Sequence, residues 1–188
     1  SPALHRLVNG GALTASVDIS GSGVDPGYWQ GDVVLEELTL RMQQYRTELA
    51  EPVLAHIADG ALTLPSSTRL VGGRTALGLR GTVGLDTLEI DLYAHGALGF
   101  EALNVLSPYW GTGGVADLEL RIYGNSSDLA YQGFADLRDV VLSPPTLRQP
   151  LEHISAHLDF RDRRIGISDL RGALGGGATI FLYTIRER

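Results

Sequence analysis

Two histidines, His153 and His157, have the spacing in this chain that comes nearest to a metal site. Four residues apart on a helix, they would share one face and could hold a metal ion together. The residues around them alternate between apolar and polar, however, which favours a strand. On a strand their side chains lie about 13 Å apart, at roughly 3.3 Å per residue, too far for one ion. We therefore predict structural or solvated histidines and no metal; His5, His56 and His95 are scattered and have no evident partner in the sequence.

Motifs for covalent or phosphate chemistry are also missing from the sequence. The chain has no cysteine, which excludes a thiol nucleophile, a disulfide and a thiolate metal ligand. The glycine-rich runs at 72–75 and 175–179 lack the lysine and the strand-to-helix context of a phosphate loop. The run at 20–23 does not place a serine as a Gly-x-Ser-x-Gly nucleophile elbow would. The sequence predicts a protein that is not an enzyme and has no cofactor.

Composition indicates a folded protein and excludes one class of partner. Apolar residues make up 44% of the 188 residues, enough for a hydrophobic core. The formal net charge of -7 argues against nucleic acid as the main partner, since phosphate backbones attract basic surfaces. No apolar run approaches the roughly 20 residues that span a bilayer. The chain starts at Ser1 and Pro2, so we expect a piece of a longer protein whose anchor or export signal lies outside it.

Alternation of apolar and polar residues dominates the chain and predicts β-strands. In residues 118–124, leucine and isoleucine occupy every second position and charged residues lie between them. A period of two puts these two sets on opposite faces of a strand. Residues 77–85 and 88–94 repeat the pattern around a turn at Asp86 and Thr87, and predict a hairpin. The 24 glycines, nearly twice the usual share of roughly 7%, lie between such runs, where turns and bulges need them.

The whole chain is expected to form an all-β fold of roughly ten to twelve short strands. Residues 32–42 fit a strand or a helix; the strand-rich context favours a strand, with Val34 and Leu38 on one face. One short helix is expected near 98–107, where apolar residues fit a period of 3.6 and Pro108 follows. The strand units repeat loosely at varying intervals, which is typical of growth in one direction.

Several motifs, in their order along the chain, resemble the β-rich repeat region of the TamB and AsmA-like proteins of diderm bacteria. The first is Leu-Gly-Leu-Arg-Gly-Thr-Val-Gly-Leu at 77–85. A strand ending in glycine at 116–125 follows, and then a run at 131–142 of the form Gly-x-Ala-x-Leu-x-Asp-Val-x-Leu. The last are the strand at 150–160, which begins with proline, and the run at 165–177, which ends in three glycines. The resemblance is stronger over 76–185 and looser over 1–75. It implies that residues 1–188 are a single fragment of a longer repetitive β-groove region.

This resemblance implies an elongated, twisted sheet folded into a β-taco or half-pipe with an apolar interior. It implies a periplasmic location, in a protein anchored in the inner membrane by a segment outside this chain. The implied partners are phospholipid and an outer-membrane β-barrel protein of the TamA type, and the implied role is movement of phospholipid between the membranes. The family has no catalytic residues to carry over, and no cofactor is implied.

The residues themselves allow the same function. About ten strands spaced ~4.8 Å apart would form a trough of roughly 50 Å. Acyl chains can lie in the trough if its walls do not close onto each other. Removing each CH₂ group from water is favourable by about 0.8 kcal/mol. We expect the following residues to line the groove: Leu77, Leu79, Val83, Leu88, Ile90, Leu92, Leu118, Leu120, Ile122, Ile154, Leu158, Phe160, Ile165, Ile167 and Ile180.

Two alternatives stay open at the level of sequence. The first is a chaperone-like scaffold that offers strand edges to outer-membrane barrel proteins during their assembly or secretion. The second is an enzyme or carbohydrate-binding β-solenoid, which would need clustered inward carboxylates or an aromatic platform. The spacing of the acidic and aromatic residues supplies neither, so the groove and the scaffold are the two hypotheses to compare.

Overall fold

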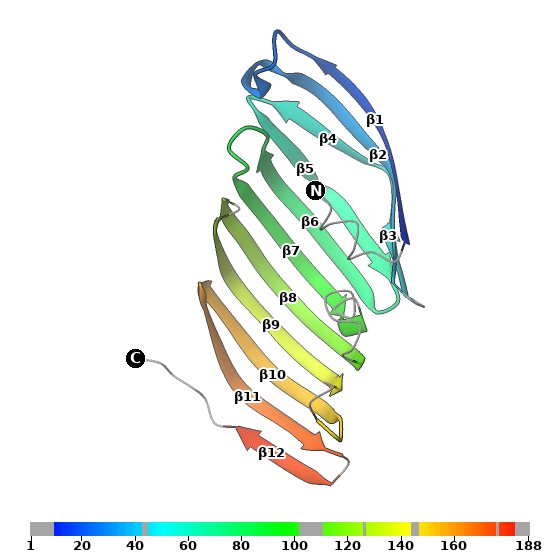
Figure 1. Cartoon of the computed structure of the whole chain (residues 1–188), viewed down its shortest axis with the longest axis vertical. Helices are drawn as coiled ribbons and strands as arrows, with labels where there is room; N and C mark the ends of the chain where they lie inside the picture. Colours follow the sequence, from blue (N-terminus) through cyan, green and yellow to red (C-terminus); the bar gives the residue numbers. More distant parts are fainter. Residues whose placement is uncertain are drawn as a thin grey trace.

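A computed structural model describes residues 10–42, 45–101, 111–125, 127–143, 147–175 and 177–182. These residues form twelve strands and a short 3₁₀ turn, η2, at Pro26–Tyr28, with 3₁₀ geometry also at Phe100 and Glu101 (Figure 1). The strands are β1 (Gly10–Ser20), β2 (Gln30–Met42), β3 (Tyr45–Leu49), β4 (Val53–Ala58), β5 (Ala61–Gly72), β6 (Thr75–Gly84), β7 (Ile90–Gly99), β8 (Gly111–Asn125), β9 (Asp128–Ser143), β10 (Leu151–Asp162), β11 (Arg164–Leu174) and β12 (Ala178–Leu182). The all-β prediction and the predicted number of strands are confirmed.

All the described strands belong to one antiparallel sheet. The strands follow one another across the sheet in almost the order of the sequence, and only β4 leaves that path, pairing with both β2 and β5. Figure 1 shows the resulting ladder running from β1 at one end of the long axis to β12 at the other. The chain exposes 12360 Å², against about 8,700 Å² for a compact protein of its mass. The architecture is therefore elongated.

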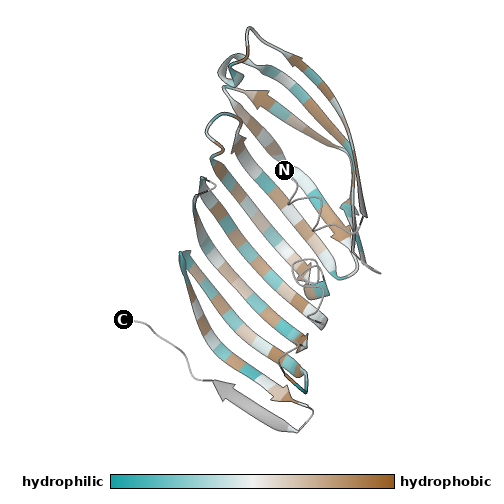
Figure 2. Ribbon diagram, viewed as in Figure 1, coloured by the Kyte–Doolittle hydropathy of each residue, from teal (hydrophilic) through white to brown (hydrophobic). Residues whose placement is uncertain are grey.

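Register assigns every side chain in the sheet to one of two faces. Leu120 on β8 lies opposite Ala94 of β7 and Gly133 of β9, while the next residue, Arg121, lies opposite Tyr93 and Gln132. Directly opposite residues point to the same face, so this alternation separates an apolar face from a polar face across the sheet. Figure 2 shows the alternation as hydrophobic and hydrophilic bands along the strands from β2 to β11. We call these the apolar face and the outer face.

Bulges bend the sheet at matching places on neighbouring strands. Asp139 of β9, His153 of β10 and Asp169 of β11 have left-handed φ values of 50°, 52° and 53°, and each lies where the register shifts. An extra residue in one strand increases the local twist and bends that strand. Three adjacent strands therefore bend together, and the apolar face keeps its continuity because the register shifts occur side by side.

Two local predictions need correction. The helix expected near 98–107 is wrong at its start, since Leu98 and Gly99 continue β7 and pair with β8. Phe100 and Glu101 have 3₁₀ geometry, and residues 102–107 lie outside the described residues. Residues 32–42 do form a strand, but Val34 and Leu38 lie on opposite faces. A bulge at Glu36 adds one residue to β2 and reverses the parity on either side of it.

Candidate functional site: the apolar face

Eleven of the fifteen expected groove residues lie together on the apolar face, and each is half-buried. They come from four strands, β6, β7, β8 and β10. The strand between β8 and β10, β9, adds Leu129 and Leu137 to the same face, and both are half-buried. The eleven expected residues are Leu77, Leu79, Val83, Ile90, Leu92, Leu118, Leu120, Ile122, Ile154, Leu158 and Phe160. Residues separated by up to 83 positions in the sequence therefore form one surface.

The remaining four expected residues are placed differently. Leu88 lies in the turn between β6 and β7 with φ 54° and 57% of its surface exposed, so its assignment to a strand was wrong. Ile165 and Ile167 lie on the apolar face of β11 but are exposed. Ile180 pairs with Gly172 of β11, which places its backbone in β12.

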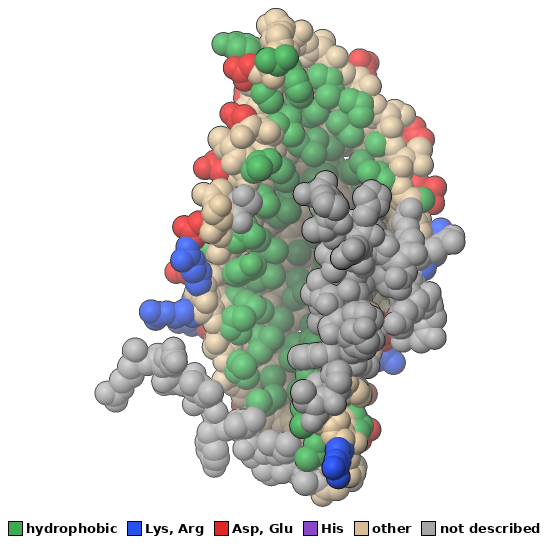
Figure 3. All heavy atoms as spheres, in the orientation of Figure 1, with side chains coloured by type: hydrophobic (Ala, Val, Ile, Leu, Met, Phe, Trp, Pro, Cys, Tyr) green, Lys and Arg blue, Asp and Glu red, His purple; other side chains and the backbone are tan. Residues whose placement is uncertain are grey.

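The apolar face is not sealed by the described residues. None of the fourteen expected residues whose side chains the structure describes belongs to the buried hydrophobic set, which consists of four alanines and three larger residues, Val53, Ile57 and Val140. A sheet packed against a second layer would bury most of its leucines and isoleucines. Figure 3 shows hydrophobic side chains gathered along the long axis of the molecule, with acidic and basic side chains at the margins. The described hydrocarbon side chains thus form a surface that a ligand could contact.

Charge is almost excluded from this surface. From β5 to β11, Asp162 is the one charged residue that register places in line with apolar-face positions among the described strands. It is the last residue of β10, is exposed and has a left-handed φ of 56°. Its carboxylate accepts a hydrogen bond at 2.8 Å from the hydroxyl of Tyr123, an outer-face residue of β8, so it belongs to the outer-face contacts. An isolated charge in the middle of the face would repel hydrocarbon because its desolvation is costly. The face therefore suits an apolar ligand along its whole described length.

The outer face carries the polar contacts that hold neighbouring strands in register. Arg121 of β8 donates two hydrogen bonds, each of 2.7 Å, to the carboxylate of Asp91 on β7. The hydrogen bond from Arg121, followed by its charge, lowers the pKa of Asp91 below its ordinary value. Tyr93 donates to Glu119 at 2.5 Å, and this bond raises the pKa of the Tyr93 hydroxyl, because ionisation would place two negative charges together.

Three histidines on the outer face have aspartate partners that the sequence did not reveal. The Nδ1 atoms of His56, His153 and His157 lie 2.6, 2.7 and 2.7 Å from carboxylate oxygens, which belong to Asp32, Asp139 and Asp136 respectively. His56 thus has a partner, contrary to the sequence-based expectation. His153 and His157, predicted to be structural or solvated, pair with aspartates at the surface. The partners lie 14 to 24 positions away and become neighbours through strand register alone.

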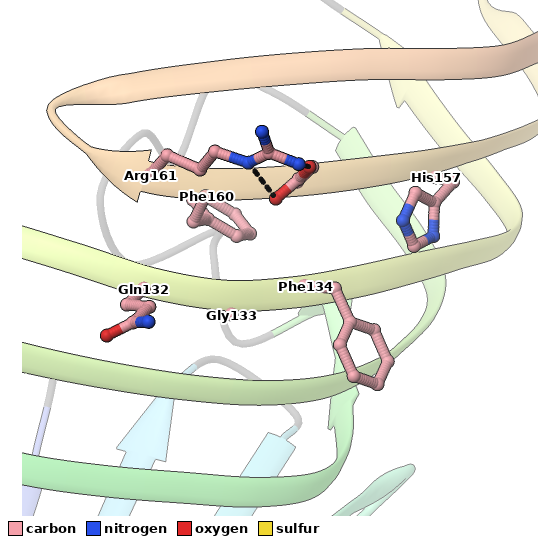
Figure 4. A pocket seen from close by; sticks show the side chains of 7 residues that line it. Gln132, Gly133, Phe134, His157, Phe160 and Arg161 are labelled. Carbon is pink, nitrogen blue, oxygen red and sulfur yellow. Dashed lines mark hydrogen bonds and ion pairs between the residues drawn. The ribbon is translucent and has the colours of Figure 1, made fainter.

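One shallow depression of about 450 Å³ lies around β9 and β10 (Figure 4). Its rim includes the ring of Phe134, which stacks on His157 at 6.0 Å between centroids. The charged groups at this site already have partners, since Arg161 binds Asp159 and His157 binds Asp136. The depression offers no free acid, base or nucleophile, so the apolar face is the better candidate site.

The described residues contain no group of three or more side chains able to hold a metal ion, and no helix of membrane-spanning length and hydropathy. No model of a known protein family matches the chain, and neither a curated protein nor a solved structure matches it. The geometry of the sheet is therefore the basis for assigning a function.

Proposed function

We propose that this chain is a segment of a TamB-like periplasmic protein whose apolar face carries the acyl chains of phospholipids between the inner and outer membranes. The observation that carries the proposal is that leucines and isoleucines of five adjacent strands are half-buried on one face, with no sealing layer among the described residues. The motif order at 77–177 supports the same family. Partners in this proposal are phospholipid and an outer-membrane barrel protein of the TamA type.

The energetics favour a curved trough over a flat sheet. An acyl chain of about 15 CH₂ groups gains roughly 12 kcal/mol when fully removed from water, and about half of that when one side rests on a flat wall. A lipid that leaves a bilayer loses this burial free energy, so the protein must supply most of it. Two walls of a half-pipe would cover the chain from both sides and supply it. Because leucine, isoleucine and valine present similar surfaces along the path, no single position would trap the lipid.

Photocrosslinking tests this proposal with a matched pair of positions. A benzophenone amino acid replaces Leu120 on the apolar face or Gln132, an exposed outer-face residue of the adjacent strand. We expect phospholipid adducts from position 120 and none from position 132, identified by mass spectrometry of the purified protein. Adducts with unfolded barrel proteins in place of lipid at position 120 would contradict the proposal and favour the scaffold hypothesis.

Charge substitution tests transport itself. Leu120→Asp places a carboxylate in the path, whereas Gln132→Asp places one on the outer face between Arg121 and Arg161, its cross-strand neighbours. Both variants are made in the full-length protein and compared for outer-membrane integrity and for phospholipid transfer. Loss of transfer in Leu120→Asp, with normal transfer in Gln132→Asp and equal protein levels, is expected. Normal transfer in a folded Leu120→Asp variant would exclude the groove mechanism.

A further inference from the structure

Large and small side chains alternate from strand to strand on the apolar face between β6 and β10. β7 carries Ala94 and Gly96 at adjacent positions of this face. Register places Gly133 and Ala135 of β9 level with them, two strands away. The flanking strands present large side chains at the same two levels, namely Leu77 and Leu79 on β6, Leu118 and Leu120 on β8, and Leu158 and Phe160 on β10. The face therefore has ridges along β6, β8 and β10, with furrows along β7 and β9 between them.

The furrow along β7 is open to solvent. Ala94 and Gly96 are half-buried, so solvent reaches this floor although leucines stand on both sides of it. The furrow along β9 is open at Gly133, whereas Ala135 is only 5% exposed. Gly96 and Gly133 have φ values of 121° and 137°, so the backbone itself requires glycine there. The φ of Ala94 is not positive, so its small side chain is a property of the face and not of the backbone.

The furrow along β7 has the dimensions of one hydrocarbon chain. Adjacent strands lie about 4.8 Å apart, so a missing row of large side chains leaves a gap of about that width. Carbon atoms in contact lie roughly 4 Å apart, so a single chain fits between the leucines of β6 and β8. Leu92 and Leu98, at the two ends of the furrow, are six residues or about 20 Å apart. An acyl chain spans about 15 Å, half of a bilayer's hydrocarbon core, so the furrow can hold one along its length.

The two ends of the furrow differ in polarity. Leu92 lies near the margin where the turns after β6, β8 and β10 gather, and charged side chains line this margin at the left of Figure 3. The exposed charged residues of these turns and the strand ends beside them are Asp86, Glu89, Asp128 and Arg163. At the other end, Leu98 lies opposite Ala116, which is 4% exposed. A phospholipid has the same asymmetry, because its headgroup is charged and hydrated and its chain ends are apolar.

We propose that a phospholipid lies along the strands of this face, with an acyl chain in the furrow of β7, the headgroup at the turn margin and the methyl end of the chain at Leu98. This inference rests on the proposed function and adds the orientation of the lipid. The chain then lies across the direction in which the strands follow one another. A lipid moving in that direction crosses the leucine ridge of β8 to the furrow of β9, a step of two strands or about 9.6 Å.

Photocrosslinking along and across the strands tests this orientation in the full-length protein. A benzophenone amino acid replaces Leu92 or Leu98, at the two ends of the furrow, and in a second pair Leu79 or Leu120, on its two walls. Tandem mass spectrometry of the phospholipid adducts locates the carbon atom that is attached. Since about 15 CH₂ groups span about 15 Å, we expect attachment from position 98 to lie about five carbons or more nearer the methyl end than attachment from position 92. Positions 79 and 120 should attach at equal depth.

The other outcomes of this experiment separate the orientation from the proposed function. Equal depths from positions 92 and 98, or the reverse order, would overturn the orientation while lipid adducts at position 120 still support the proposed function. The absence of lipid adducts at all four positions would refute the proposed function and the orientation together.

Filling the furrow tests the same seat without a crosslinker. Ala94→Leu adds a large apolar side chain to the floor, whereas Ala97→Leu adds one to the outer face of the same strand. A chain that lies along β7 loses its place in Ala94→Leu, but a chain that runs across the strands meets one more leucine. We expect phospholipid transfer to be at least fivefold slower in Ala94→Leu and unchanged in Ala97→Leu, at equal protein levels.

The transfer measurements are read together with those of Leu120→Asp. Unchanged transfer in Ala94→Leu, or equal losses in both leucine variants, would overturn the orientation, and loss of transfer in Leu120→Asp would show that the groove mechanism stands without it. Unchanged transfer in both Ala94→Leu and a folded Leu120→Asp would refute the groove mechanism as well.

Discussion

Gly133→Ala is the substitution for which the structure gives the sharpest stability prediction. Gly133 lies on the apolar face of β9 with φ 137°, a region that residues with a side chain rarely adopt. A Cβ added there would lie 2.0 Å from the carbonyl oxygen of Glu119 in β8. The obstacle is backbone, so no side-chain rotation can relieve it. The substitution must move β9 away from β8 at the position where Gly133 pairs with Leu120.

The expected loss follows from two contributions. Holding a non-glycine residue at such a φ costs about 1–3 kcal/mol. Moving β9 from β8 weakens at least one ladder hydrogen bond, worth about 1 kcal/mol. We therefore expect a loss of about 3 kcal/mol in the free energy of unfolding, which lowers the Tm by roughly 6–12 °C for a chain of this length. Because the total stability of a protein is about 5–15 kcal/mol, this loss is readily measured.

Gly113→Ala in β8 is the matched control. No atom lies within 4 Å of a Cβ built on Gly113, and its φ is not left-handed. Replacing glycine by alanine at a compatible site changes stability by about 1 kcal/mol or less, mainly through the unfolded chain. Urea unfolding of both variants, followed by circular dichroism, gives the comparison. Equal stabilities of Gly133→Ala and Gly113→Ala would refute the view that the close approach of β8 and β9 requires glycine.

Three further predictions concern the two faces. The hydrogen bond from Arg121 stabilises the folded state fully when the pH is above 3.8, the ordinary pKa of the Asp91 carboxyl, and this stabilisation is lost as the pH falls through the lowered pKa. In thermal scans, Arg121→Gln should lose this pH dependence of the Tm, which is small because the pair is exposed. Absorbance titration should show a raised pKa for the Tyr93 hydroxyl, and Glu119→Gln should lower this pKa toward its ordinary value. The stability that the bond supplies should be lost as the pH rises through the raised pKa. Ile57→Ala should lower the free energy of unfolding, measured in urea, by about 2–5 kcal/mol, because Ile57 is buried. Alanine at a half-buried leucine of the apolar face, such as Leu120, should lower it by less.

The period of two was enough to predict the strands, because alternation survives whatever the strand pairs with. The hairpin of β6 and β7 was predicted correctly for the same reason. The parity of β2 was predicted wrongly. Glu36 interrupts the apolar positions of this strand, but one polar residue at an apolar position does not by itself distinguish a bulge from a regular strand, and the bulge reverses every assignment beyond it. Leu88 was misplaced because it has an apolar side chain in a turn longer than the two residues expected.

The residues of the apolar face could be predicted from the sequence, whereas the contacts on the outer face could not. Eleven half-buried apolar residues follow from parity within single strands, which the sequence contains. The pairing of His157 with Asp136, in contrast, depends on the register between β9 and β10, which includes two shifts. Register is decided by turn geometry and bulges between strands, so a residue's partner across the sheet is a property that single-strand patterns do not encode.

The division between the two faces has a physical cause. The described residues supply no second layer against the apolar face, so the contacts among them that fix the register lie within the sheet or on the outer face. Arg121 with Asp91 joins β7 to β8, and Tyr123 reaches from β8 to Asp162 at the end of β10. Each exposed contact is worth less than about 1 kcal/mol, but such contacts recur from strand to strand. Moving them to the apolar face would place charges among its hydrocarbon side chains, where their desolvation is costly. The outer face can therefore hold the strands in register while the apolar face stays free of charge, as the proposed lipid path requires.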